Sequence, residues 1–103
     1  MRYNEAIASF EHSISIKPEN AKALNGKGVA LFYKGNNTLA LEVFDQAIIT
    51  NPEFIKPWNN GAFVFMKQEK YAKAAKAYQE ALYYANRQTD PQGIGDFLFE
   101  TVF

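Results

Sequence analysis

Side chains that could support catalysis are few in this chain and are not grouped. His12 is the sequence's only histidine and cysteine is absent, so no histidine or thiolate set exists to hold a metal ion such as zinc. Ser9, Ser13 and Ser15 lie in a segment of helical periodicity, without the tight strand-to-helix turn that exposes a nucleophilic serine. Gly26-Lys27-Gly28 lacks the spacing of a phosphate-binding loop. We therefore expect no enzyme activity, no metal and no cofactor, with His12 on the surface.

The composition is that of a neutral globular chain. Its 103 residues include 11 basic and 11 acidic ones, and 48% are hydrophobic. This balance lacks the positive charge that marks nucleic-acid binding. No apolar run approaches the roughly 20 residues needed to cross a bilayer, and no signal-type apolar segment follows Met1. We expect one cytoplasmic domain that binds neither nucleic acid nor membrane.

Apolar side chains recur every three or four residues, which is the spacing of one face of an α-helix. Pro18 and Pro52 end two such segments, and Asn20 is a suitable N-cap for the segment that follows it. The predicted helices cover 2–16, 21–34 and 38–50, then a segment with Pro57 in its first turn that ends near Lys67, and a last one from about 71 to Asn86. No strand alternation stands out, so the pattern predicts helices in antiparallel pairs joined by short loops.

A 34-residue spacing organises the chain. Pro18 and Pro52 keep this spacing, and so do Phe10 and Phe44; Ala6, Ala40 and Ala74 keep it through three copies. A fixed period of this length indicates stacked units that cannot bury their apolar faces alone. Such stacks form long concave surfaces that bind other chains.

The residues at fixed places of each unit resemble the tetratricopeptide repeat family. Unit 21–54 supplies Leu24, Gly28, Leu31, Ala40, Phe44, Ala47 and Pro52; unit 55–88 supplies Trp58, Ala62, Phe65, Ala74, Tyr78 and Ala81, with Asn86 in place of the proline; half-unit 1–20 supplies Tyr3, Ala6, Phe10 and Pro18, with Ser13 in place of an alanine. The resemblance implies an all-α, right-handed solenoid of antiparallel helix pairs.

Small and aromatic positions predict how the helices pack. Gly28 and Ala62, with Ala40 and Ala74, are small where paired helices should approach within about 8–10 Å. The aromatic positions should fill the wider space between successive units.

The tail 89–103 continues the repeat. A shift of 34 places Pro57 on Pro91, Gly61 on Gly95, Phe63 on Phe97 and Phe65 on Phe99. The segment is therefore predicted to be a partial repeat or a capping helix. The chain then starts with a second-type helix and ends with a first-type helix, so it is either a fragment of a longer array or meets another molecule at its ends. The residues expected to self-associate are Tyr3, Ile7, Phe10, Ile94, Phe97, Leu98 and Val102.

The resemblance implies that the first helix of each unit lines an inner, concave groove. By register, the groove residues are Lys22, Asn25, Val29, Tyr33, Lys56, Asn59, Asn60, Phe63 and Lys67, with Gly26 beside them. Lys22 with Lys56, and Asn25 with Asn59, should stack into ladders. An asparagine amide suits a peptide backbone because it both donates and accepts, and the lysines favour acidic side chains or a terminal carboxylate.

Two functions remain open from the sequence. One is a non-catalytic scaffold that binds a peptide or protein segment in the concave groove. The other is a structural module that assembles with itself through its unpaired terminal helices. In the first case groove substitutions should abolish partner capture; in the second, removal of 89–103 should change the oligomeric state.

Overall fold

The computed structural model describes residues 2–89, and this part of the chain consists of five α-helices without a strand. They are α1 (Tyr3–Ile16), α2 (Ala21–Tyr33), α3 (Asn37–Thr50), α4 (Ile55–Lys67) and α5 (Tyr71–Thr89). The predicted all-α class is confirmed, and four of the helices end within a residue or two of the predicted bounds. Helix α5 runs on to Thr89 instead of ending near Asn86.

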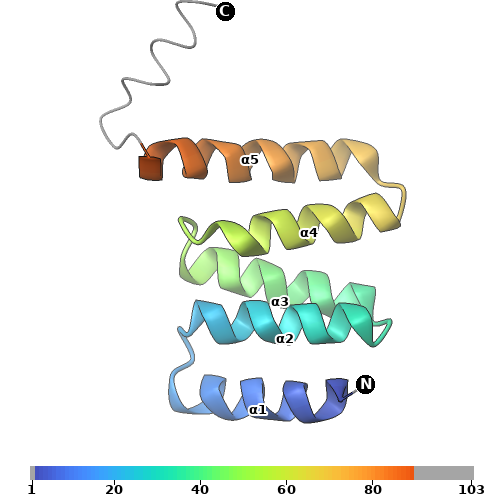
Figure 1. Cartoon of the computed structure of the whole chain (residues 1–103), viewed down its shortest axis with the longest axis vertical. Coiled ribbons are helices and arrows are strands. Elements are labelled where there is room, and N and C mark those ends of the chain that lie inside the picture. Colours follow the sequence, from blue (N-terminus) through green and yellow to red (C-terminus); the bar gives the residue numbers. More distant parts are fainter. Residues whose placement is uncertain (1, 90–103) are drawn as a thin grey trace, which may run out of the picture.

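Consecutive helices run antiparallel and stack in chain order from α1 to α5 (Figure 1). Each helix packs on the next, and α2 also contacts α4, two elements further along the chain. Helices α1 and α5 therefore lie at opposite ends of the stack (Figure 1). This is the helical repeat solenoid of antiparallel pairs that the 34-residue spacing predicts.

Asparagine side chains begin two of the helices. The Asn20 Oδ1 accepts a hydrogen bond from the Ala23 N–H at 3.0 Å, which confirms the predicted N-cap. The Asn36 Oδ1 accepts from the Leu39 N–H at 3.2 Å in the same way. Each bond satisfies a backbone donor that has no partner within its own helix.

The C-termini of α2 and α4 close with the same backbone motif. The Asn36 N–H bonds to the Leu31 carbonyl at 2.9 Å, and a bond of the same spacing closes α4 at 2.8 Å. The residue inside each closing turn is left-handed: Gly35 has φ +97° and Glu69 has φ +60°. These are the features of a Schellman motif, which normally uses glycine at this place.

The core lies where α2, α3 and α4 meet. Its buried members are Leu24, Leu31, Ala40, Val43, Phe44, Ala47 and Val64. A Cβ on Gly28 would lie 2.4 Å from the Phe44 ring, so this glycine makes room for an aromatic side chain of the paired helix. Phe44 packs inside its own unit against Gly28 and also shares the core with Val64 of the following unit. Phe10 of α1 packs across to Gly26 of α2 in the following unit, as expected.

Trp58 of α4 contacts both α5 and the loop that precedes α4. Its Nε1 donates to the Pro52 carbonyl at 2.9 Å, and its ring stacks on Tyr84 with centroids 6.0 Å apart. One residue of α4 thus ties the α3–α4 loop to α5.

Candidate functional site

Helices α2 and α4 meet through a pair of asparagines. The Asn60 Nδ2 donates to the Asn25 Oδ1 at 2.9 Å, and Asn25 is only 9% exposed. Asn59, which was expected to pair with Asn25 in a ladder, is exposed. Asn25 therefore pairs with Asn60 instead of Asn59, and the ladder of Lys22 with Lys56 stays a prediction. A buried amide requires a partner, and the rotation of α4 presents Asn60 to Asn25 and turns Asn59 toward solvent.

Four aromatic rings form a continuous row across α1, α2 and α4. Tyr3 stacks on Tyr33 with centroids 5.9 Å apart, Tyr33 meets Phe32 edge-on at 5.4 Å, and Phe32 meets Phe63 edge-on at 5.5 Å. We call Tyr3, Tyr33, Phe32 and Phe63 the aromatic row. Tyr33 is 60% exposed and Phe63 is 43% exposed, so the row is open to solvent at two of its members.

The sequence identified only part of this row. Tyr33 and Phe63 were placed on the inner face from the repeat register. Phe32 was missed, although an aromatic residue beside Tyr33 is a visible signal. Tyr3 was assigned to self-association, but its ring lies against Tyr33.

Two of the three helices that carry the row, α2 and α4, contribute lysines and no carboxylates. Neither α2 nor α4 contains an acidic residue. Lys22, Lys56 and Lys67 are exposed, and the Lys67 Nζ lies 5.3 Å from the centroid of the Phe63 ring. The Lys27 Nζ is 3.5 Å from the Glu11 carboxylate of α1. Three exposed positive charges therefore lie on α2 and α4, and the charge of Lys67 lies against the aromatic row.

Two of the expected groove residues are covered by contacts within the chain. Val29 is half-buried and packs against the core. Gly26 lies beneath the Phe10 ring, and a Cβ added to this glycine would lie 2.4 Å from that ring. Of the predicted groove residues, the structure leaves open Lys22, Tyr33, Lys56, Asn59, Phe63 and Lys67, with Asn60 half-buried.

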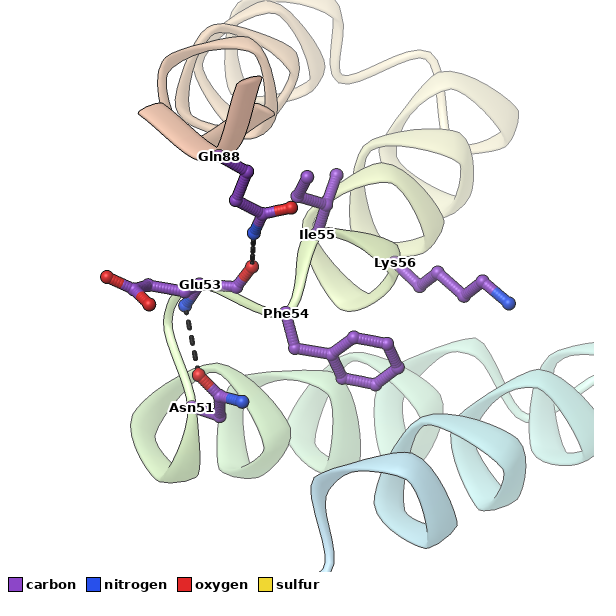
Figure 2. A pocket seen from close by; sticks show the side chains of 6 residues that line it. All are labelled: Asn51, Glu53, Phe54, Ile55, Lys56 and Gln88. Atoms are coloured by element: carbon purple, nitrogen blue, oxygen red, sulfur yellow. Dashed lines mark hydrogen bonds between the residues drawn. The ribbon is translucent and has the colours of Figure 1, made fainter. Parts of the chain in front are cut away.

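A shallow depression of about 510 Å³ lies beside the α3–α4 loop. Its lining residues are Asn51, Glu53, Phe54, Ile55, Lys56 and Gln88, which Figure 2 shows around the loop and the end of α5. The Gln88 Nε2 donates to the Glu53 carbonyl, and the Asn51 Oδ1 accepts from the Glu53 N–H at 3.2 Å. The first bond fastens the end of α5 to the loop, and the second lies within the loop. The depression thus belongs to the packing of the last unit, and only Lys56 links it to the predicted groove.

The three α1 residues predicted to self-associate are engaged inside the molecule. Tyr3 stacks on Tyr33, Ile7 packs against the core, and Phe10 covers Gly26. The apolar face of α1 is thus turned toward α2, and self-association through these residues stays a prediction. Their predicted counterparts, Ile94, Phe97, Leu98 and Val102, lie outside the described residues.

No set of His, Cys, Asp and Glu side chains within residues 2–89 is placed to hold a metal ion. His12 is exposed, as expected. Partial burial raises the pKa of the Asp45 carboxyl above its ordinary value of 3.8. Among the described helices, none combines the length and apolar character needed to cross a membrane.

Comparisons with known proteins agree with this architecture. The RNA polymerase-associated protein CTR9 of Caenorhabditis elegans is 31% identical over 87 residues, which make up 84% of this chain and 8% of that protein. The uncharacterised protein y4yS of Sinorhizobium fredii is 38% identical over 52 residues, or 50% of this chain and 29% of that protein. The chain thus spans less than a third of either relative. A crystal structure of MamA superposes with a TM-score of 0.80 at 20% identity, over 84% of this chain and 51% of that one, a likeness of fold.

The family model for the tetratricopeptide repeat matches residues 2–53, which is half of the sequence. The match covers α1, α2 and α3 and the loops between them. With the stacked antiparallel helices and the 34-residue spacing already described, it identifies the chain as a member of the tetratricopeptide repeat family.

Proposed function

We propose that this domain is a non-catalytic scaffold that binds an acidic peptide segment carrying apolar side chains along α2 and α4. Stacked repeats of this kind are interaction scaffolds, whose extended surfaces hold other chains. The observation that carries the proposal is the aromatic row, which is open to solvent and accompanied by lysines without a carboxylate on either helix.

The aromatic row supports binding because it is held in place before a partner arrives. Each ring of the row touches the next across α1, α2 and α4. Rings fixed in this way lose little conformational entropy on binding, which lowers the cost of association. Large rigid aromatic side chains are also the ones that most often dominate binding energy at interfaces.

The lysines define the charge of the expected ligand. Lys22, Lys56 and Lys67 are exposed, and the acidic residues of the described helices lie on α1, α3 and α5. A positive surface attracts an acidic partner, raises its association rate and makes binding sensitive to salt. Asn59 adds an exposed amide that can both donate to and accept from an extended peptide backbone.

The proposal is tested with labelled synthetic peptides and fluorescence anisotropy. One peptide alternates glutamate with leucine and phenylalanine, the second has lysine in place of glutamate, and the third has serine in place of the apolar residues. We expect binding of the first peptide alone, weakened by salt. Tyr33→Ala and Phe63→Ala should each weaken it by about tenfold, the effect of removing one interface anchor.

Charge variants complete the test. Lys56→Glu should weaken binding of the acidic peptide. Lys76→Glu, on the exposed surface of α5, should leave that binding unchanged. Equal binding of the lysine peptide, or full binding by a folded Phe63→Ala protein, would show that α2 and α4 are not the binding face.

Self-assembly through the terminal helices stays a prediction from the sequence. The three α1 residues that were expected to contribute face α2, so the two ends of the stack are not equivalent. The repeat boundaries at 21–54 and 55–88, the cytoplasmic location and the exclusion of nucleic acid stay predictions from the sequence.

A further inference from the structure

Two asparagines of this sequence are followed by glycine, and the fold brings these two together. They are Asn25, which precedes Gly26 in α2, and Asn60, which precedes Gly61 in α4. The Asn60 Nδ2 donates to the Asn25 Oδ1 at 2.9 Å, so a hydrogen bond between α2 and α4 joins the two dipeptides. We call Asn25-Gly26 and Asn60-Gly61 the Asn-Gly pair.

An asparagine followed by glycine is prone to lose its side-chain amide, because glycine has no Cβ to obstruct ring closure and its backbone turns freely. The glycine nitrogen forms a bond to the asparagine Cγ, the bond from Cγ to Nδ2 breaks, and the proton of the glycine nitrogen leaves with Nδ2 as ammonia. Water then adds to one of the two carbonyl carbons of the cyclic imide and opens the ring. Aspartate results when the original backbone is kept, and isoaspartate results when the chain continues through the side-chain carbon. The net reaction consumes one water and releases one ammonia.

The helical backbone opposes this reaction at both places. Inside an α-helix each N–H donates to the carbonyl four residues earlier, so the nitrogens of Gly26 and Gly61 are held within the helix. Ring closure requires the asparagine to leave the helical φ and ψ, which opens that turn of the helix. The bond between the two asparagines adds to this protection, because it holds the Asn60 Nδ2 that has to depart.

The two dipeptides are not equally protected. Asn25 is 9% exposed, whereas Asn60 is half-buried. The Phe10 ring lies over Gly26, and nothing lies within 4 Å of the equivalent point at Gly61. A local opening therefore has fewer contacts to break at Asn60-Gly61 than at Asn25-Gly26.

We propose that the Asn-Gly pair is a modification site controlled by the fold. The closed contact between α2 and α4 preserves both amides, and an opening of α4 exposes Asn60 to deamidation, with Asn25 reacting only when α2 opens as well. The proposal concerns the stability of this contact, and it does not rest on peptide binding by the two helices.

Either product changes the contact after it has opened. Isoaspartate at position 60 adds one methylene to the backbone in the interior of α4, which disrupts the hydrogen-bond ladder of the helix. Aspartate keeps the backbone, but an ionised carboxylate only accepts hydrogen bonds, so the donor to the Asn25 Oδ1 is lost. Aspartate also places a negative charge on a helix that otherwise has no acidic residue. Deamidation thus converts a transient opening into a permanent change.

The test incubates the full chain in mildly alkaline buffer, with and without enough urea to unfold it. Tandem mass spectrometry of the digested protein measures conversion at Asn25, Asn59 and Asn60, and chromatography separates isoaspartate from aspartate. In urea, we expect Asn25 and Asn60 to convert at similar rates, both faster than Asn59, which is followed by asparagine. Without urea, both should convert at least about 100-fold more slowly, because the opened state of a packed helix is rare. Asn60 should then convert before Asn25.

Variants separate the hydrogen bond from the dipeptide. Asn25→Ala removes the acceptor and should speed conversion at Asn60 in buffer by about tenfold, the effect of losing one such bond. The matched control Asn59→Ala changes an exposed side chain and should leave that rate unchanged. Gly61→Ala has room for its Cβ, and in urea it should slow conversion at Asn60 while conversion at Asn25 stays the same.

Three results would each overturn the proposal. Equal rates at Asn60 with and without urea would show that the fold does not control the reaction. Conversion at Asn25 before Asn60 in buffer would contradict the expected order. An unchanged rate in a folded Asn25→Ala protein would show that the bond between the asparagines does not protect Asn60. The first two comparisons use the unaltered chain, so they decide the matter even where Asn25→Ala does not fold.

Discussion

Glu69 occupies the left-handed position that Gly35 holds one repeat earlier. Both residues lie inside the turn that closes a first helix, with the same backbone hydrogen bonds around them. Glycine adopts this conformation without a steric penalty, whereas a residue with a Cβ is crowded in it by about 1–2 kcal/mol. The fold therefore imposes the same turn on both units, and only one of them has the residue that suits it.

Glu69→Gly should stabilise the domain by about 1 kcal/mol, because it removes that crowding. The free energy of unfolding is measured by urea denaturation. The matched variant Gly35→Ala should change it in the opposite direction by a similar amount. A destabilised Glu69→Gly protein would show that the Glu69 side chain contributes more than its backbone strain costs.

Gly28→Ala should destabilise the domain by about 1–3 kcal/mol, as expected for an overpacked core. The added Cβ would lie 2.4 Å from the Phe44 ring, which is almost fully buried and has little room to move. Gly61→Ala is the control, since nothing lies within 4 Å of its Cβ direction. Alanine is preferred over glycine within a helix by about 0.5–1 kcal/mol, so this variant should be neutral or stabilised. Thermal unfolding of both variants checks the contrast.

Asn60→Ala should cost about 1–3 kcal/mol, since it leaves the buried Asn25 Oδ1 without its donor. Asn59→Ala should change stability by less than about 0.5 kcal/mol because its side chain is exposed. The double variant Asn25→Ala/Asn60→Ala should cost less than the sum of the two single changes. Additive losses in urea unfolding would mean that the two amides do not interact.

Asp45 should make stability fall with rising pH over the range just above its ordinary pKa of 3.8. Partial burial raises the pKa of this carboxyl in the folded state, so the folded protein binds more protons there than the unfolded chain does. The slope of unfolding free energy against pH is then negative for this group. Asp45→Asn should remove that contribution, which is measured as the difference between the two proteins across a pH series. An identical pH profile for both proteins would contradict it.

The helices and their order were predictable because they depend on local signals. Pro18 and Pro52 mark helix ends, and Asn20 makes the N-cap bond that its residue type favours. The 34-residue spacing then places each unit on the next. These features follow from the backbone preferences of single residues and from a repeat that is visible in the printed sequence.

The contacts between helices were less predictable, because they depend on how each helix is rotated about its axis. The register placed both Asn59 and Asn60 on the inner face, but only the packed structure selects Asn60 as the partner of Asn25. In the same way, Tyr3 was known to lie on an apolar face, yet that face is turned inward to Tyr33. Neighbouring side chains point in directions about 100° apart around the helix axis. A rotation of the whole helix by part of that angle therefore changes which side chain makes the contact.

Trp58 is the sole tryptophan of the chain, and it is fixed by Pro52 and Tyr84 at the junction of α3, α4 and α5. The aromatic row on α1, α2 and α4 consists of tyrosine and phenylalanine only. Intrinsic emission excited selectively at the indole thus monitors the C-terminal pair of helices and is blind to ligand contact with the row. Optical melting curves recorded that way describe the loosening of one end of the solenoid, and the opposite end needs a tyrosine or backbone signal of its own.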